Sequence, residues 1–144
     1  MNTVGAAIAS AVVFVWLGMV LAISFLEAPL KFRAPGVTVP LGLGIGRLVF
    51  RALNLVEAVL AAAVVAAVAV SGPPVSVTVL TGVLAVLLVV QLGIVRPRLN
   101  RRSDRVLAGE EKMPISQGHV YYVALECVKV VLLIALGVSM LVAR

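Results

Sequence analysis

The sequence has 144 residues but only one cysteine and one histidine. A single cysteine, Cys127, excludes an internal disulfide and a CxxC redox pair within the chain. With His119 as its only histidine, the chain does not offer a haem held by two histidines or a metal site built from several of them. The sequence therefore identifies no cofactor.

Charged residues are also scarce, at 12% of the chain, whereas soluble domains carry about 25%. Hydrophobic residues make up 62%, and the mean hydropathy of +1.20 is too high for a soluble core of this length. Four stretches approach or exceed the roughly 20 apolar residues that cross a bilayer. These are residues 4–26, 52–71, 75–95 and 120–142. The sequence predicts an all-α, four-helix transmembrane bundle that forms one integral membrane domain, 1–144.

Acidic residues are few, and the basic residues are unevenly placed. Nine of the twelve lysines and arginines lie in two connections, 28–50 and 96–118, and a tenth, Arg51, directly follows the first connection. The first residues and the short connection after the second span carry no charged side chain. By the positive-inside rule, both basic connections are expected to be cytoplasmic loops and both termini to lie outside. We therefore predict a multi-pass protein of the cell membrane, namely the bacterial inner membrane.

This asymmetry also explains the net charge of +6, so no nucleic-acid partner is expected. The expected partners are the lipid bilayer and other membrane proteins. Small residues in the spans allow close helix packing, which favours a homo-oligomer or a subunit of a membrane complex.

Prolines and glycines are expected to bound the spans. Pro29 and Pro35 should break the chain after the first span, and Pro97 should stop the third, because proline lacks the backbone donor that a helix needs. The glycine-rich segment 39–50 should run along the interface, because glycine weakens helices. The spacing from Pro29 to Glu57 is 28 residues and that from Pro97 to Glu126 is 29. Two tandem helical hairpins or a chance similarity would both give this spacing.

Polar side chains inside the spans gather toward the predicted cytoplasmic side. Helical periodicity places those of span 2 on neighbouring faces and those of span 4 on one stripe. Ionisable groups inside a bilayer normally face the bundle interior and pair with one another. The candidate ligand-binding residues are Arg47, Arg51, Asn54, Glu57, His119, Tyr122, Glu126 and Lys129, with Glu27 and Gln91 as a second tier.

Two acids and two bases would form a buried set of zero net charge, which makes burial tolerable. Arg51 can pair with Glu126 while Glu57 pairs with Lys129, or each pair can form within its own helix. Either pairing predicts that Arg51 is buried and that its replacement by glutamine destabilises the fold.

Arg47 and His119 would then lie at the mouth of a cytoplasm-facing pocket and meet an amphipathic anionic small molecule or lipid. A through-pore is not expected, because the outer two-thirds of the spans lack polar lining. The competing interpretation is purely structural: the charges hold helices together, and Trp16, Tyr121 and Tyr122 are interfacial belt residues.

The end of the first span carries a short motif in "WLGMVLAISFLEAPLKF", followed later by "GRLVF". It resembles the F-x-x-A-P-x-x-F motif of an uncharacterised family of bacterial four-span membrane proteins. The resemblance implies four spans and no established chemistry. The matching residues are Phe25, Ala28, Pro29, Phe32, Gly46 and Phe50.

Span 2 supports a second resemblance. Arg51, Ala52, Asn54 and Glu57 resemble the Arg-Ala…Asn-x-x-Glu motif of the membrane-associated eicosanoid and glutathione metabolism family. That family has four spans and outside termini, and its motif binds glutathione. The resemblance implies a thiol-dependent membrane enzyme, in which Tyr122 or Lys129 would stabilise a thiolate. The chain departs from the motif in a shorter arginine-to-asparagine spacing and in the missing proline after the glutamate.

Overall fold

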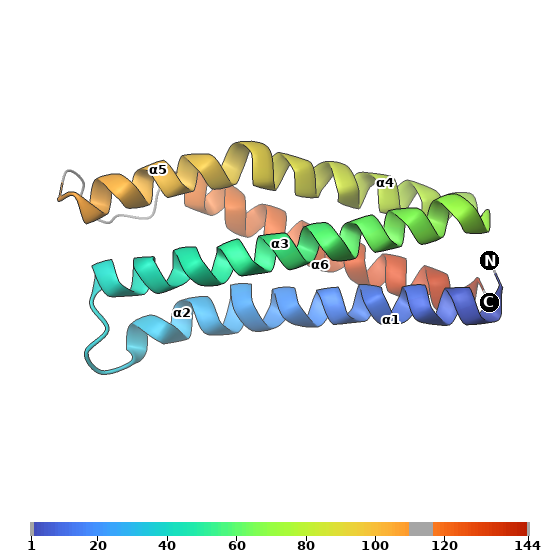
Figure 1. Ribbon diagram of the computed structural model, residues 1–144, viewed down its shortest axis with the longest axis horizontal. Coiled ribbons are helices and arrows are strands. Elements are labelled where there is room, and N and C mark those ends of the chain that lie inside the picture. Colours follow the sequence, from blue (N-terminus) through green and yellow to red (C-terminus); the bar gives the residue numbers. More distant parts are fainter. Residues whose placement is uncertain (1, 110–116, 144) are drawn as a thin grey trace.

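The computed structural model describes residues 2–109 and 117–143, except for the side chains of 103, 106 and 117–119. Over this part of the chain the structure is helical and contains no strand. Four long helical rods lie side by side along one axis (Figure 1). The elements are α1 (Thr3–Val20), η1 (Leu21–Glu27), α2 (Ala28–Leu30), η2 (Lys31–Arg33), α3 (Val39–Ser71), α4 (Val75–Val90), η3 (Gln91–Val95), α5 (Arg96–Leu107) and α6 (Gln117–Val142).

The predicted all-α, four-helix architecture is confirmed. Each rod is long and apolar enough to cross a membrane, as in a multi-pass integral membrane protein. Helix α1 packs against α3 and α6, and α4 packs against the same two helices, so α1 and α4 occupy opposite corners of the bundle.

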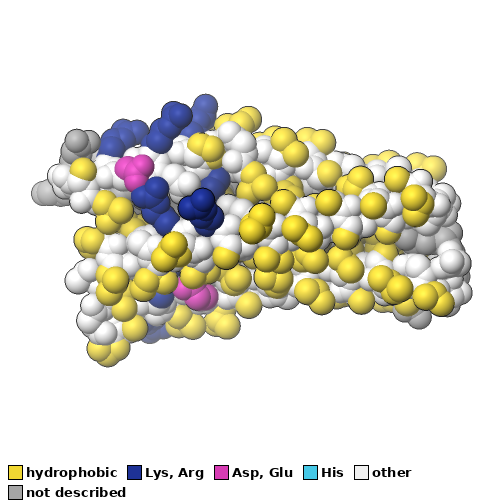
Figure 2. All heavy atoms as spheres, viewed as in Figure 1, with side chains coloured by type: hydrophobic (Ala, Val, Ile, Leu, Met, Phe, Trp, Pro, Cys, Tyr) yellow, Lys and Arg dark blue, Asp and Glu magenta, His cyan; other side chains and the backbone are white. Residues whose placement is uncertain are grey.

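The two ends of the bundle differ in charge. Both termini and the connection from α3 to α4 lie at one end, which we call the terminal end (Figure 1). Arginine and lysine side chains gather toward the opposite end on the face shown in Figure 2. We call this the basic end and define it by Arg33, Arg47, Arg51, Arg96 and Arg98.

The terminal end has an apolar core. Its two buried hydroxyl groups, on Ser10 and Thr81, donate to the carbonyl oxygens of Ala6 and Val77 in their own helices. Among the described residues, these hydroxyl groups therefore do not link one helix to another. The core residues are Ala9, Val13, Trp16, Val20, Val64, Val68, Val77, Leu84, Leu88, Leu133, Leu136 and Met140.

The prediction that prolines end the helices is wrong for Pro29 and Pro97, whereas the first rod does end at Arg33, two residues before Pro35. Helical structure continues past Pro29 to Arg33 and past Pro97 to Leu107. In both rods a π-helical turn, η1 or η3, ends two residues before the proline. A π-helical turn shifts the hydrogen bonding by one residue, which gives the chain a way to accommodate a proline. The shared feature agrees with tandem hairpins, and a duplication remains a prediction.

Helix α3 begins at Val39, so most of the predicted first loop is wrong: residues 39–50 are helical. The Thr38 hydroxyl caps the helix by accepting from the Leu41 backbone N–H at 3.3 Å. Gly42 and Gly46 lie against Phe32 and Lys31, and a Cβ at Gly42 would overlap the Phe32 ring. Close packing therefore offsets the low helix propensity of glycine. The second predicted loop is likewise helical from Arg96 to Leu107.

Candidate functional site

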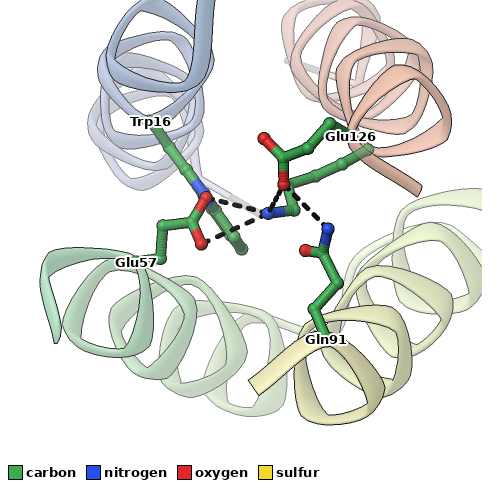
Figure 3. A network of polar contacts seen from close by, with 5 residues as sticks. Trp16, Glu57, Gln91 and Glu126 are labelled. Atoms are coloured by element: carbon green, nitrogen blue, oxygen red, sulfur yellow. Dashed lines mark hydrogen bonds and ion pairs between the residues drawn. The ribbon is translucent and has the colours of Figure 1, made fainter. Parts of the chain in front are cut away.

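Five buried side chains from all four rods meet between the apolar core and the basic end. They point toward one another across the centre of the bundle (Figure 3). Each is at most 2% exposed to solvent. We call this set the buried network: Trp16, Glu57, Gln91, Glu126 and Lys129.

The Lys129 ammonium group lies between two carboxyl groups. Its Nζ donates to Oε1 and Oε2 of Glu57 at 3.0 and 3.2 Å, and to Oε1 of Glu126 at 2.7 Å. Glu126 and Lys129 are three residues apart on α6 and therefore share a helix face. The lysine thus ties α6 to α3 in the interior.

Two neutral side chains complete the network. The Trp16 indole N–H donates to Oε1 of Glu57 at 3.2 Å, and Nε2 of Gln91 donates to Oε1 of Glu126 at 2.8 Å. Two polar atoms of the network are buried without a hydrogen-bond partner among the described residues, namely Oε2 of Glu126 and Oε1 of Gln91. The network is therefore nearly but not fully satisfied.

An aromatic layer separates the buried network from the basic end. Phe50 and Tyr122 are buried and meet edge to face with ring centroids 6.0 Å apart. The Arg96 guanidinium carbon lies 4.4 Å from the Phe50 centroid and 5.4 Å from that of Tyr122. A cation at this distance is attracted to the ring faces. Tyr122 thus belongs to the aromatic layer, on which the Arg96 guanidinium stacks.

Arg51 and Asn54 lie elsewhere, in a groove on the outer surface of α3. The groove has a volume of about 600 Å³ and is lined by Leu48, Arg51, Ala52, Asn54, Leu55, Ala58 and Leu92. Arg51 is exposed, and no ion pair or hydrogen bond of its side chain occurs among the described residues. We call this site the outer groove.

The expected pairing is therefore correct only in part. Glu57 pairs with Lys129 across the bundle, and Glu126 pairs with Lys129 within α6. Arg51 pairs with neither glutamate, so the expected closed set of two acids and two bases is wrong. From Arg51 to Glu57 the helix turns through about 120°, which directs the two side chains to different faces. An internal pocket lined by both residues is not formed.

The remaining candidates are spread over the basic end. Arg47 forms an ion pair with Asp104 of α5, a residue that sequence reasoning missed. Glu27 and Lys31 form an ion pair at 3.6 Å, and no hydrogen bond joins Glu27 to the buried network in the described part of the chain. The side chain of His119 lies outside the described residues.

The competing interpretation of Trp16 and Tyr122 as interfacial belt residues is wrong, because both side chains are buried and Trp16 donates to Glu57. Trp16 is the fourteenth residue of the 18-residue helix α1, on the face that also buries Val13 and Val20. The sequence held two signals for this position. Trp16 lies deep inside the span, and it shares a helical stripe with residues of the core.

Comparison of the chain with protein-family models, with curated proteins and with solved structures finds no match. The site must therefore be interpreted from its own geometry.

Proposed function

We propose that this protein binds an anionic amphiphile, such as an anionic phospholipid, in the outer groove at the basic end of its membrane bundle. The observation that carries the proposal is the exposed Arg51, which opens into an apolar groove without an anionic partner among the described residues. Asp104, an acid on the neighbouring α5, is paired with Arg47 instead.

The groove has the chemistry of an amphiphile site. Arg51 supplies a guanidinium group that can bind a phosphate or carboxylate through two parallel hydrogen bonds. Asn54, one turn deeper, offers a second donor. The other five lining residues are apolar, so an acyl chain can continue along the groove. A volume of about 600 Å³ lies within the range of small-molecule sites.

The depth of Arg51 also fits an anionic headgroup. Arg51 is six residues before Glu57, so its backbone lies about 9 Å nearer the basic end along the helix axis. A long arginine side chain at this level can reach the headgroup region. If the basic end faces the cytoplasm, as its charge predicts, the groove opens to a leaflet that carries anionic lipids.

Native mass spectrometry of the protein in detergent with added phosphatidylglycerol tests the proposal. We expect Arg51→Gln to weaken the affinity for this lipid about tenfold, since a charge-assisted hydrogen bond contributes about 1.5–3 kcal/mol. The matched control is Arg98→Gln on α5, which removes the same charge from an exposed site outside the groove. Its affinity should stay within about twofold of wild type.

Equal loss in both variants would indicate nonspecific charge attraction and would contradict the proposal. Unchanged binding in Arg51→Gln would do the same and would favour a structural or accessory role in a membrane complex.

The thiol-enzyme alternative has a separate readout. Glutathione at millimolar concentration should raise the thermal stability of wild type but not of Arg51→Gln if that alternative holds. The position of Glu57, which is turned inward onto Lys129, gives this alternative no support.

A further inference from the structure

The buried network has one more acid than base. It holds the carboxyl groups of Glu57 and Glu126 and the single ammonium group of Lys129. From the helices packed around it, α1 contributes the neutral Trp16 and η3 the neutral Gln91. On the basic side, Tyr122 lies below Arg96, whose guanidinium stacks on the aromatic layer. With every acid ionised, the five side chains of the network would carry a net charge of −1, and the Arg96 guanidinium, across the aromatic layer, forms no ion pair with either glutamate among the described residues.

Such a charge is costly in this position. An ionised carboxylate buried without compensation is disfavoured by far more than a neutral group, and the usual outcome is that it takes up a proton. Removal of one partner from a buried ion pair is strongly destabilising for the same reason. One bound proton makes the network neutral.

The hydrogen bonds indicate which carboxyl group carries the proton. Both oxygens of Glu57 accept hydrogen bonds, from Lys129 and Trp16, as an ionised carboxylate requires. Glu126 accepts two hydrogen bonds through Oε1, whereas its Oε2 is buried without a partner among the described residues. Burying the neutral hydroxyl group of a protonated Glu126 at this unpaired position costs less free energy than burying a charged carboxylate oxygen there.

The surroundings also indicate the side from which the proton comes. Toward the terminal end the network borders the apolar core, whose buried hydroxyl groups on Ser10 and Thr81 are bonded within their own helices. Toward the basic end, Tyr122 lies one turn before Glu126 on α6, with the Arg96 guanidinium 5.4 Å from its ring. A phenol and a guanidinium group therefore lie on the basic side of the network, whereas the two buried hydroxyl groups named on the terminal side are bonded within their own helices.

We propose that the buried network is a binding site for a single proton, held on Oε2 of Glu126 and exchanged through the basic end. Release of this proton adds one negative charge at the point where all four rods meet. The site thereby links proton availability at the basic end to the packing of the bundle. This inference is independent of the outer groove and of its ligand.

Infrared difference spectroscopy of the protein in phosphatidylcholine vesicles tests the site. A protonated carboxyl group has a carbonyl stretch distinct from that of a carboxylate. We expect one such band in wild type at neutral pH and none in Glu126→Gln. Glu57→Gln should also abolish it, because Glu126 then ionises to pair with Lys129. Asp104→Asn, a change at an exposed acid paired with Arg47, should leave the band intact.

Absence of the band in wild type, or its persistence in Glu126→Gln, would overturn the proposal. If Glu126→Gln does not fold, persistence of the band in Glu57→Gln would still overturn the proposal, because it would show that the proton does not depend on the excess of acid over base in the network.

The route is tested by transfer to deuterated water, which moves the band to lower frequency as the proton exchanges. Tyr122→Phe should slow this shift several-fold, whereas Thr81→Val, on the opposite side of the network, should leave its rate unchanged. Slowing by Thr81→Val alone would show that the proton passes through the terminal end.

Discussion

Helix α3 presents two different polar faces near the basic end. Its inner face carries Glu57, which is 1% exposed and accepts hydrogen bonds from Trp16 and Lys129. Its outer face carries Arg51 and Asn54, which line an open groove. These residues lie within seven consecutive positions of one helix. The comparison shows that burial and direction, more than depth along the helix, separate the structural polar groups from those available to a ligand.

The two faces also differ in what a lost charge costs. On the inner face, an unpaired charge cannot be solvated by water, so each partner depends on the others. On the outer face, a side chain can reach the headgroup region and remain solvated. Substitutions of the same kind should therefore have unequal effects on the two faces.

The largest effect is expected for Lys129→Met on the inner face. It leaves Glu57 and Glu126 without their shared cation, and we expect a loss of about 3–5 kcal/mol in unfolding free energy. Thermal unfolding in detergent, followed by circular dichroism, measures this loss. Arg51→Met is the control on the outer face and should unfold within error of wild type. Equal destabilisation by both variants would contradict the assignment of the two faces.

Trp16→Phe should have the next largest effect. It removes the indole donor to Glu57 and reduces the volume of a residue in the core. A hydrogen bond to a charged group contributes about 1.5–3 kcal/mol, so a loss of this order or somewhat more is expected. In a double-mutant cycle, the loss should shrink when Glu57 is replaced by glutamine. Full additivity of the two changes would show that the bond contributes nothing.

A smaller contrast is expected between two glycines at the start of α3. Gly42→Ala should destabilise the bundle by about 1–3 kcal/mol, because the new methyl group overlaps the Phe32 ring. Gly44 has open space around its position, so Gly44→Ala should stabilise the helix by up to about 1 kcal/mol. Thermal unfolding of both variants checks the sign. A stabilising Gly42→Ala would mean that the first connection does not pack as described.

The smallest effect is expected for the ion pair between Arg47 and Asp104. Both side chains are well exposed, at 39% and 57%, so Arg47→Gln should cost at most about 1 kcal/mol. This cost should fall further at high salt, which screens exposed charges. Unfolding measured at low and high ionic strength tests this dependence. A salt-independent loss comparable to that of Lys129→Met would place this pair among the buried contacts.

Much of the fold was predictable, because the length of the apolar runs and the placement of arginines are properties of the sequence alone. The helix boundaries were less so. Pro97 and the glycines of residues 39–50 have weak helix propensity, yet a π-helical turn and the contact of Gly42 with Phe32 keep these segments helical. Such contacts join residues from different helices, and the periodicity or composition of one segment does not predict them.

Four apolar helices, the gathering of basic residues at one end and the presence of ionisable groups inside the spans all follow from the amino-acid sequence alone. The tertiary structure decided which of these groups meet. Periodicity gives only the angle between side chains on one helix, and Arg51 and Glu57 differ by about 120°. The packing of all four rods sets how each helix is rotated about its own axis. This rotation decides which face of the helix is buried in the bundle and which face contacts lipid. That rotation buried Glu57 against Lys129 and Trp16 and left Arg51 outside.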